Sequence, residues 1–154
     1  MPVRTATVDD VPHMARLAGE KRRAYEAYSP VFWRVAPDDI AIHARHLEKV
    51  LGDADRICLI DDALRGFVIG SVVDPPPVYA PGGKALMVDD FVVANPAWWE
   101  TVGKALRNEL HRRAAERGVA VSITVCGHQD EPKRTALRNA GATVASEWYV
   151  QPLG

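Results

Sequence analysis

The strongest constraint on the fold is a strand, a helix and a second strand in direct succession. Residues 85–93, ALMVDDFVV, form an apolar run of strand type, and residues 99–118 place apolar side chains at helical spacing among charged ones. Gly118 ends this helix, and residues 119–126, VAVSITVC, form a second apolar run that predicts a buried strand. Such a unit predicts a parallel strand pair joined by a crossover helix.

The other expected elements are, in chain order, a strand at 3–8, helices at 9–28 and 38–52, strands at 56–61 and 64–73, a short helix at 131–141 and a final strand at 143–150. Antiparallel strands followed by one crossover unit predict an α+β fold of three layers. Its central sheet is mixed and mostly antiparallel, with helices on both faces, as in α/β three-layer proteins. A length of 154 residues fits one domain spanning residues 1–154.

The charge balance argues against two classes of partner. Nineteen basic and 20 acidic residues give a net charge of −1, so no general affinity for nucleic acid or membrane is expected. The N-terminal residues lack the apolar core of a signal peptide, which favours a cytoplasmic protein. Cys58 and Cys126 lie in apolar runs and are expected to be buried thiols. Because no second ligand accompanies Cys126 at metal-binding spacing, no metal site is expected.

The start of the helix after residues 85–93 is a candidate anion site. Unpaired N–H groups and the positive end of a helix dipole suit a diphosphate. We expect this helix to begin near Thr101. Gly103 would let a ligand approach the backbone, and Lys104 and Arg107 would meet further phosphate charge. The alternative is an ordinary helix that packs on a sheet and contains one interior glycine.

Two stretches carry a family resemblance. They are MVDDFVVANPAWWETVGKALRNELHRRAAERG, residues 87–118, and PKRTALRNAGATV, residues 132–144. With the element order, they resemble the GCN5-related N-acetyltransferase (GNAT) superfamily. YSPVFWR and SEWYV are similar to segments of small bacterial members. The family's diphosphate loop reads Arg or Gln, two residues, Gly, one residue, then Gly or Ala. Here Trp98, Thr101 and Gly103 occupy those three positions, so the loop is degenerate.

The resemblance implies an acyl-CoA N-acyltransferase-like fold that uses acetyl-CoA as co-substrate. Pantetheine would pair with the backbone of residues 91–93, and residues 102–104 would face the diphosphate. Asp130 takes the place of a helix-start Asn that contacts the cofactor arm, and Lys133 or Arg134 would meet the ribose phosphate. Trp98 and its neighbour either pack beneath the loop or flank the pantetheine or adenine. The expected cofactor-binding residues are Phe91, Val92, Val93, Trp98, Thr101, Val102, Gly103, Lys104, Arg107, Asp130, Lys133 and Arg134.

Acetyl transfer to an amine needs a neutral amine, an oriented carbonyl and a proton source for the leaving thiolate. Asp89 and Asp90 are the candidate bases. Adjacent strand residues point to opposite faces, so only one of them can face the acceptor. The alternative is a structural role, in which one of these carboxylates caps a neighbouring loop or pairs with Arg4 or Arg56. The family's usual acid is a tyrosine where Leu137 stands, which leaves Tyr149 or His128 as candidates; His128 is otherwise a turn residue.

The connection between the first two helices overhangs the acceptor cleft in this fold. It is expected to bind an acceptor through Tyr25, Tyr28, Phe32, Trp33 and Arg34, or else to close the core as a hydrophobic plug. We therefore expect an N-acetyltransferase that acts on a small-molecule or peptide primary amine by direct transfer in a ternary complex. The alternative is a non-catalytic ligand- or CoA-binding module. A homodimer built on the aromatic loop and residues 146–150 is a further expectation.

Overall fold

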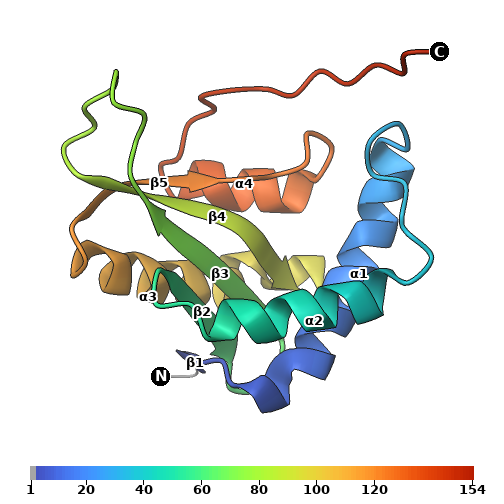
Figure 1. Cartoon of the computed structure of the whole chain (residues 1–154), viewed down its shortest axis with the longest axis horizontal. Coiled ribbons are helices and arrows are strands. Elements are labelled where there is room, and N and C mark those ends of the chain that lie inside the picture. The colour runs from blue at the N-terminus through green and yellow to red at the C-terminus, as the bar shows by residue number, and fades with distance from the viewer. Residues whose placement is uncertain (1–2) are drawn as a thin grey trace.

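The computed structural model describes residues 3–154 (Figure 1). Its five strands form one sheet in the order β1-β2-β3-β4-β5. The strands are β1 (Val3–Thr5), β2 (Arg56–Asp61), β3 (Gly66–Val73), β4 (Lys84–Val93) and β5 (Val119–Thr124). The first three pairings are antiparallel and only β4 and β5 run parallel. The predicted mixed, mostly antiparallel sheet with one crossover is therefore confirmed.

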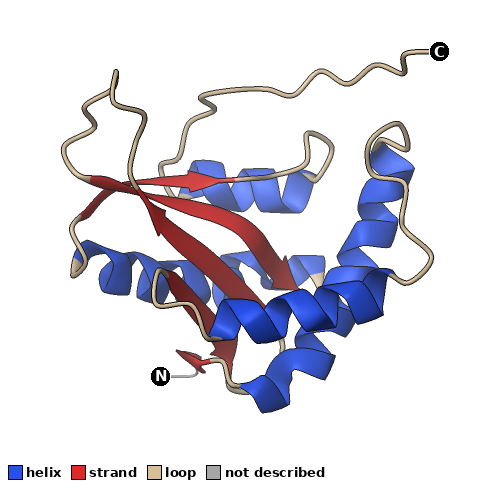
Figure 2. Cartoon of the chain, viewed as in Figure 1, coloured by secondary structure: helices blue, strands red, loops and turns tan. Residues whose placement is uncertain are grey.

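Four α-helices flank this sheet (Figure 2). They are α1 (Val11–Tyr28), α2 (Asp39–Leu51), α3 (Lys104–Ala115) and α4 (Glu131–Asn139), with shorter turns at Val8–Asp10, Pro96–Trp98 and Trp99–Gly103. Helices α1 and α2 cover one face and α3 covers the other, as the expected three-layer α+β fold requires. Within residues 3–154 no helix combines the length and the apolar character needed to cross a membrane.

Each face of the sheet has its own hydrophobic core. On the side of α1 and α2, the core includes Met14, Leu47, Ile60, Phe67 and Val92. On the side of α3, it includes Leu59, Val68, Phe91, Leu106 and Leu110. Neighbouring residues of β2 and β3 go to opposite cores because side chains alternate along a strand. The central strands are therefore apolar on both faces, which explains why their sequences read as nearly continuous apolar runs.

Strand β4 contains a β-bulge at Asp89. Ile69 of β3 lies opposite Asp90 and the next residue, Gly70, lies opposite Val88, which leaves Asp89 without a partner. The extra residue changes the phase of the alternation. Val88 and Phe91 consequently face the same core, although two residues lie between them and a regular strand would place them on opposite faces. Asp90 now faces the side of α1 and α2, and Asp89 is exposed.

Beyond this bulge, β4 and β5 separate. Their pairing ends at Val88 and Thr124, and the last bond between them runs from the N–H of Val125 to the Val88 carbonyl at 2.9 Å. The chain then turns through residues 126–130 into α4. Within residues 3–154, no strand pairs with residues 90–93 of β4 on the edge that faces β5. An open backbone edge therefore lies between β4 and the start of α4.

Three sequence expectations need correction. The helical segment after β4 begins at Pro96, not near Thr101, because a 3-10 turn and a π-helical turn lead into α3 without a break. The expected final strand at 143–150 does not form; this tail runs away from the body (Figure 1). Strand β5 is not buried, since Val121 and Ile123 remain 37% and 45% exposed. The two findings are linked: because residues 143–150 form no strand, β5 pairs only with β4 within residues 3–154 and is the edge of the sheet.

Candidate active site

Asp90 is held by a chain of hydrogen bonds that crosses three elements. The Nε2 of His43, on α2, lies 2.9 Å from Oδ2 of Asp90. The other ring nitrogen of His43 lies 2.9 Å from Nη1 of Arg22, on α1, and Arg22 also donates to Asp39 at 3.0 Å. Because a guanidinium can only donate, Nδ1 of His43 must accept. The proton of the neutral imidazole is therefore on Nε2, where it is donated to Asp90.

This arrangement keeps the Asp90 carboxyl ionised. Burial by itself raises the pKa of Asp90, but the hydrogen bond from His43 and the positive charges of Lys21 and Lys133 outweigh burial, so the pKa lies below its usual value. The carboxylate is 19% exposed, which leaves it within reach of a ligand. An ionised acid that is partly desolvated and fixed by a neutral histidine is suited to binding an ammonium group and orienting it in the cleft.

Lys133 of α4 fills the space beside the open edge of β4. Only 1% of the residue is exposed, and its Nζ donates to the Phe91 carbonyl at 3.1 Å. The same Nζ lies 5.4 Å from the ring centroid of Phe91 and 5.3 Å from that of Trp99. Burial, assisted by the nearby charge of Lys21, lowers the pKa of Lys133 to about 7. Lys133 therefore lies inside the molecule, not on the surface where a ribose phosphate would be met.

The turn that precedes α4 is fixed by Tyr25. Its hydroxyl donates to Oδ2 of Asp130 at 2.6 Å and accepts from the N–H of Gly127 at 3.1 Å. Asp130 also caps α4 by accepting from the N–H of Lys133. Burial and the bond to Asp130 raise the pKa of Tyr25. Tyr25 is itself buried. The expectation that it binds an acceptor is therefore corrected, because its hydroxyl is bonded to the turn before α4.

The helix entrance differs from the expected diphosphate loop. Asn95 caps it, accepting from the N–H of Ala97 through its side chain and from the N–H of Trp98 through its carbonyl. Val102 and Gly103 are buried within the π-helical turn. A Cβ at Gly103 would lie 2.8 Å from Cε3 of Trp99, so the close approach that this glycine permits is to a tryptophan ring. The backbone from 102 to 104 is therefore interior to the helix and does not form its exposed start.

Several cations surround this region on the outside. Lys104 is exposed and Arg107 is half-buried on the first turns of α3, and neither forms a salt bridge within residues 3–154. Arg134 of α4 is engaged, because it donates to the carbonyl of His128 and to Glu131. Glu100 accepts from Asn139 at 2.9 Å and so links the helix entrance to α4. Side chains, and not backbone N–H groups, are therefore the available partners for an anion here.

The aromatic loop between α1 and α2 lies beside the C-terminal tail. The rings of Phe32 and Trp148 meet edge to face at 5.7 Å, and a shallow pocket of about 540 Å³ is lined by residues 30–32 and 34 together with Val150–Pro152. Trp33 packs on Tyr25 at 4.8 Å, whereas Arg34 is exposed. The loop therefore combines a packed part, which includes Tyr28 and Trp33, with an exposed part, which includes Phe32 and Arg34.

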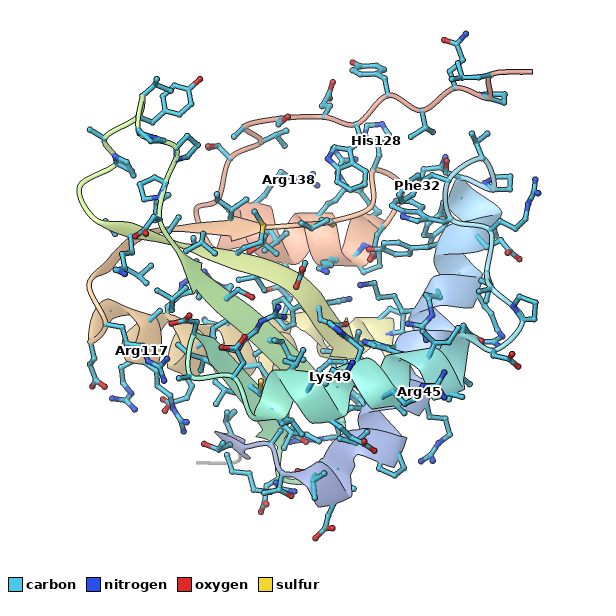
Figure 3. The ribbon with its side chains drawn as sticks, viewed as in Figure 1. Phe32, Arg45, Lys49, Arg117, His128 and Arg138 are labelled. Atoms are coloured by element: carbon cyan, nitrogen blue, oxygen red, sulfur yellow. The ribbon has the colours of Figure 1, made fainter. Side chains whose placement is uncertain are left out.

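The two candidate acids do not join Asp90. Tyr149 is 88% exposed in the tail, and its hydroxyl donates to Glu147 at 2.6 Å. His128 is exposed in the turn before α4, and Figure 3 shows its ring between the body and the tail. Asp89, at the bulge, also points away from the network of Asp90. No group of three metal-type side chains occurs in the part of the chain that the structure describes.

Sequence reasoning missed His43, Arg22 and the buried position of Lys133. One signal for His43 was available, because it shares the inward face of α2 with Ala44, Leu47 and Val50. A histidine on that face must lie near the sheet. No comparable signal marks Lys133, because the enclosing rings of Phe91 and Trp99 come from distant parts of the chain.

Comparison with solved structures identifies the fold of the chain. Neither a protein-family model nor a curated protein sequence matches the chain. A mutant of the BH1408 protein from Bacillus halodurans superposes with a TM-score of 0.83 at 15% identity, over 99% of both chains. A ribosomal-protein-alanine N-acetyltransferase from Brucella melitensis matches with a TM-score of 0.68 at 24% identity, covering 99% of this chain and 98% of that one.

A third similar structure contains a cofactor. It is a predicted acetyltransferase from Clostridium acetobutylicum with acetyl-CoA, with a TM-score of 0.70 at 15% identity over 97% of this chain and 94% of that one. These likenesses show that the chain shares the fold of these three proteins, two of which are named acetyltransferases.

Proposed function

We propose that the protein is an N-acetyltransferase that moves an acetyl group from acetyl-CoA to a primary amine, by direct transfer in a ternary complex. The observation that carries this proposal is the open edge of β4 with the ionised Asp90 at its start. An extended ligand arm can add to such an edge as an extra strand would, and the carboxylate lies where the arm would end. The acetyltransferase names of proteins with the same fold support this reading.

We propose that the cofactor arm pairs with this edge, whereas the expected diphosphate contact does not fit the backbone. The Phe91 carbonyl accepts one hydrogen bond, from Lys133, and a carbonyl oxygen can accept a second. The expected backbone pairing with residues 91–93 is therefore compatible with the structure. For the diphosphate, we assign the side chains of Lys104 and Arg107 as the main partners, because residues 102–104 lie within a continuous helix. When bound, acetyl-CoA supplies the thioester whose acetyl group is transferred.

Asp90 is the base in this proposal. An incoming ammonium donates a proton to the free oxygen of the carboxylate, and the neutral amine then attacks the thioester carbonyl. The new C–N bond forms as the C–S bond breaks, the nitrogen gives up a second proton to become an amide, and the thiolate takes up one proton. His43 cannot take the amine's proton while Arg22 occupies its Nδ1, so it positions Asp90. We assign Lys133, whose Nζ lies beside the Phe91 carbonyl and whose pKa is about 7, as the group that gives a proton to the thiolate at neutral pH.

One set of observations favours a second function, a binding module without catalysis. Lys133 and the ring of Trp99 already fill the region beside Phe91, and the helix entrance offers no free backbone N–H groups at 102–104. In that case the cleft would bind an acceptor through Phe32 and Arg34 and transfer nothing. Affinity for acetyl-CoA separates the acetyltransferase from a module that binds only the acceptor, and acetyl transfer separates it from a module that binds CoA without catalysis.

The first test is calorimetric titration with acetyl-CoA, CoA and dephospho-CoA, together with thermal unfolding. Micromolar binding corresponds to about 8 kcal/mol and raises the melting temperature with ligand concentration. No binding at millimolar ligand would favour the binding module. Acceptor amines are then screened by thiol release. Asp90→Asn is expected to lower kcat/KM on an active amine by about 100-fold or more, whereas Asp89→Asn, its neighbour at the bulge, serves as the matched control and should stay near wild type.

We place the protein in the cytoplasm, where acetyl-CoA is available. The acceptor that we propose is a small molecule or peptide with a primary amine, gripped in part by the exposed aromatic and guanidinium groups of the loop between α1 and α2. Arg34 is the group in this loop able to pair with a carboxylate or phosphate on the acceptor, because its side chain is exposed.

A further inference from the structure

Lys21 is a cation that no side chain of the protein neutralises. It lies half-buried on α1, and its Nζ lies 5.2 Å from the ring centroid of Tyr25. The next two residues of α1, Arg22 and Arg23, both pair with Asp39. In the part of the chain that the structure describes, the ammonium of Lys21 forms no salt bridge and donates no hydrogen bond. It is therefore available to an anion that arrives from outside.

The ammonium of Lys21 lies near the two charged groups of the proposed site. The Tyr25 ring beside it is bonded through its hydroxyl to the turn before α4. Although burial opposes it, the hydrogen bond from His43 lowers the pKa of Asp90 on β4, and the charge of Lys21 lowers it further. After burial, the charge of Lys21 is also the next cause of the lowered pKa of Lys133 on α4. Helix α1 therefore adds a positive charge to the cleft between β4 and α4.

This charge discriminates between classes of amine. An ammonium that binds Asp90 enters the field of Lys21, and two like charges repel each other. A second ammonium on the acceptor, as in a diamine, increases the repulsion. A carboxylate or phosphate on the acceptor offsets it, because such a group can bind the ammonium of Lys21 while the amine binds Asp90. The site thus disfavours one class of acceptor and favours another, and both effects contribute to specificity.

We propose that Lys21 binds an anionic group of the acceptor, so that the acceptor is a small amine whose carbon chain also carries a carboxylate or a phosphate. This proposal rests on the acetyltransferase function proposed above, because it names the substrate class of the same site. Asp90 holds the amine end of the acceptor and Lys21 holds the anionic end. Two contacts at opposite ends orient the amine for attack. Lys21 determines specificity and takes no part in the proton transfers.

An anion beside Lys21 also changes the protonation of Lys133. The charged groups around Lys133 are Lys21 from α1, Asp90 from β4, and Cys126 and Asp130 from the turn before α4. Burial lowers the pKa of Lys133 most and Lys21 lowers it further, whereas the other three groups raise it. An acceptor anion that offsets the charge of Lys21 therefore raises the pKa of Lys133. Binding of such an acceptor above pH 7 should take up protons from the buffer, which supplies the proton that the thiolate needs.

The test measures acceptor binding without turnover. The probes are amines that carry a carboxylate, from glycine to aminohexanoate, or a phosphate, as in aminopropyl phosphate. Each is compared with the alkylamine of the same chain length, and diaminobutane supplies the doubly charged case. Chemical-shift titrations of isotope-labelled protein give the dissociation constants. We expect the best anionic amine to bind about 10-fold or more tightly than its alkylamine, the size of one charge-assisted hydrogen bond, and diaminobutane to bind most weakly.

Three variants separate Lys21 from other cations. Lys21→Met keeps the apolar stem and removes the charge, so it should abolish the preference for anionic amines without weakening alkylamine binding, whereas Lys21→Arg should keep the preference. Lys49→Met is the matched control, because Lys49 is an exposed lysine of α2 whose charge affects Asp90 and Lys133 less than that of Lys21. Calorimetry in buffers of different ionisation enthalpy should show proton uptake with anionic amines in wild type and none in Lys133→Met.

Several results would overturn the assignment. Anionic amines that bind no more tightly than alkylamines, or that do not bind at the highest soluble concentration, would refute the anion site. A preference that persists in Lys21→Met would move the anion to another cation, such as Arg34. The proposed function fails separately. An anion preference that depends on Lys21, with no binding of acetyl-CoA, would keep the anion site and refute the transferase, whereas thiol release with alkylamines alone would do the reverse.

Discussion

The buried Lys133, beside the open edge of β4, predicts how the free energy of unfolding depends on pH. The lysine is 1% exposed and has no carboxylate within hydrogen-bonding distance. Burial lowers its pKa from 10.5 to about 7, so the folded protein releases this proton more readily than the unfolded chain does. At about 1.4 kcal/mol for each pH unit, the difference corresponds to about 5 kcal/mol of instability below pH 7.

The sign follows from proton counting. Between pH 7 and 10.5 the unfolded chain binds more protons at this site than the folded protein, so stability rises with pH across that window. Lys133→Met removes the titration and costs about 1 kcal/mol for the lost bond to the Phe91 carbonyl. The variant should therefore be more stable than wild type by about 4 kcal/mol at pH 6, and the difference should shrink steadily towards pH 10.

Urea unfolding at pH 6, 7, 8 and 9 measures this difference directly. Lys104→Met makes the same change at an exposed lysine, and its difference from wild type should not depend on pH. A Lys133→Met variant that is less stable than wild type at pH 6 would refute the reasoning. That result would mean that the rings of Phe91 and Trp99 and the nearby carboxylates stabilise the ammonium more than burial destabilises it.

Two further predictions concern packing and acid stability. Gly103→Ala should destabilise the protein by about 1–3 kcal/mol in urea, because its Cβ would lie 2.8 Å from Trp99; Gly52→Ala, with only a backbone contact at 3.7 Å, should stay near wild type. The hydrogen bond from Arg4 lowers the pKa of Asp10 to about 2, so this carboxylate stabilises the fold above its ordinary pKa of 3.8 and the contribution is lost as pH falls towards 2. Acid titration of Asp10→Asn should show a smaller loss of stability between pH 4 and 2, and an unchanged curve would contradict this role.

The sequence predicted the sheet where the hydrophobic period was strong and failed where burial depends on a distant neighbour. The runs at 85–93 and 119–126 were correctly read as strands of one crossover unit, because the amphipathic period of the helix between them is unambiguous. The run at 119–126 was also read as buried, yet β5 lies at the edge of the sheet. Apolar composition alone does not distinguish a central strand from a strand at the edge of a sheet.

The candidate site shows the same division between local and long-range information. The pair Asp89–Asp90 indicated that one carboxylate faces a functional cleft, but only the bulge decides which. His43 contacts Asp90 from 47 positions away in the chain, and Arg22, another 21 positions earlier, holds His43. The start of the helical segment after β4 was predicted wrongly for a local reason. Asn95 and Pro96 are an ordinary helix-start signal, but the prediction was based on the later Gly103.

The bulge at Asp89 has a consequence for chain length. If this one residue were deleted, Val88 and Asp90 would become neighbours, and the strand would alternate regularly with every apolar side chain still directed to its present core. The extra residue therefore adds nothing to core burial. It adds the bend after which β4 separates from β5. In a chain without this residue, β4 and β5 should stay paired beyond Val88. The open edge at Phe91 would then be lost, while the two hydrophobic cores would be unchanged.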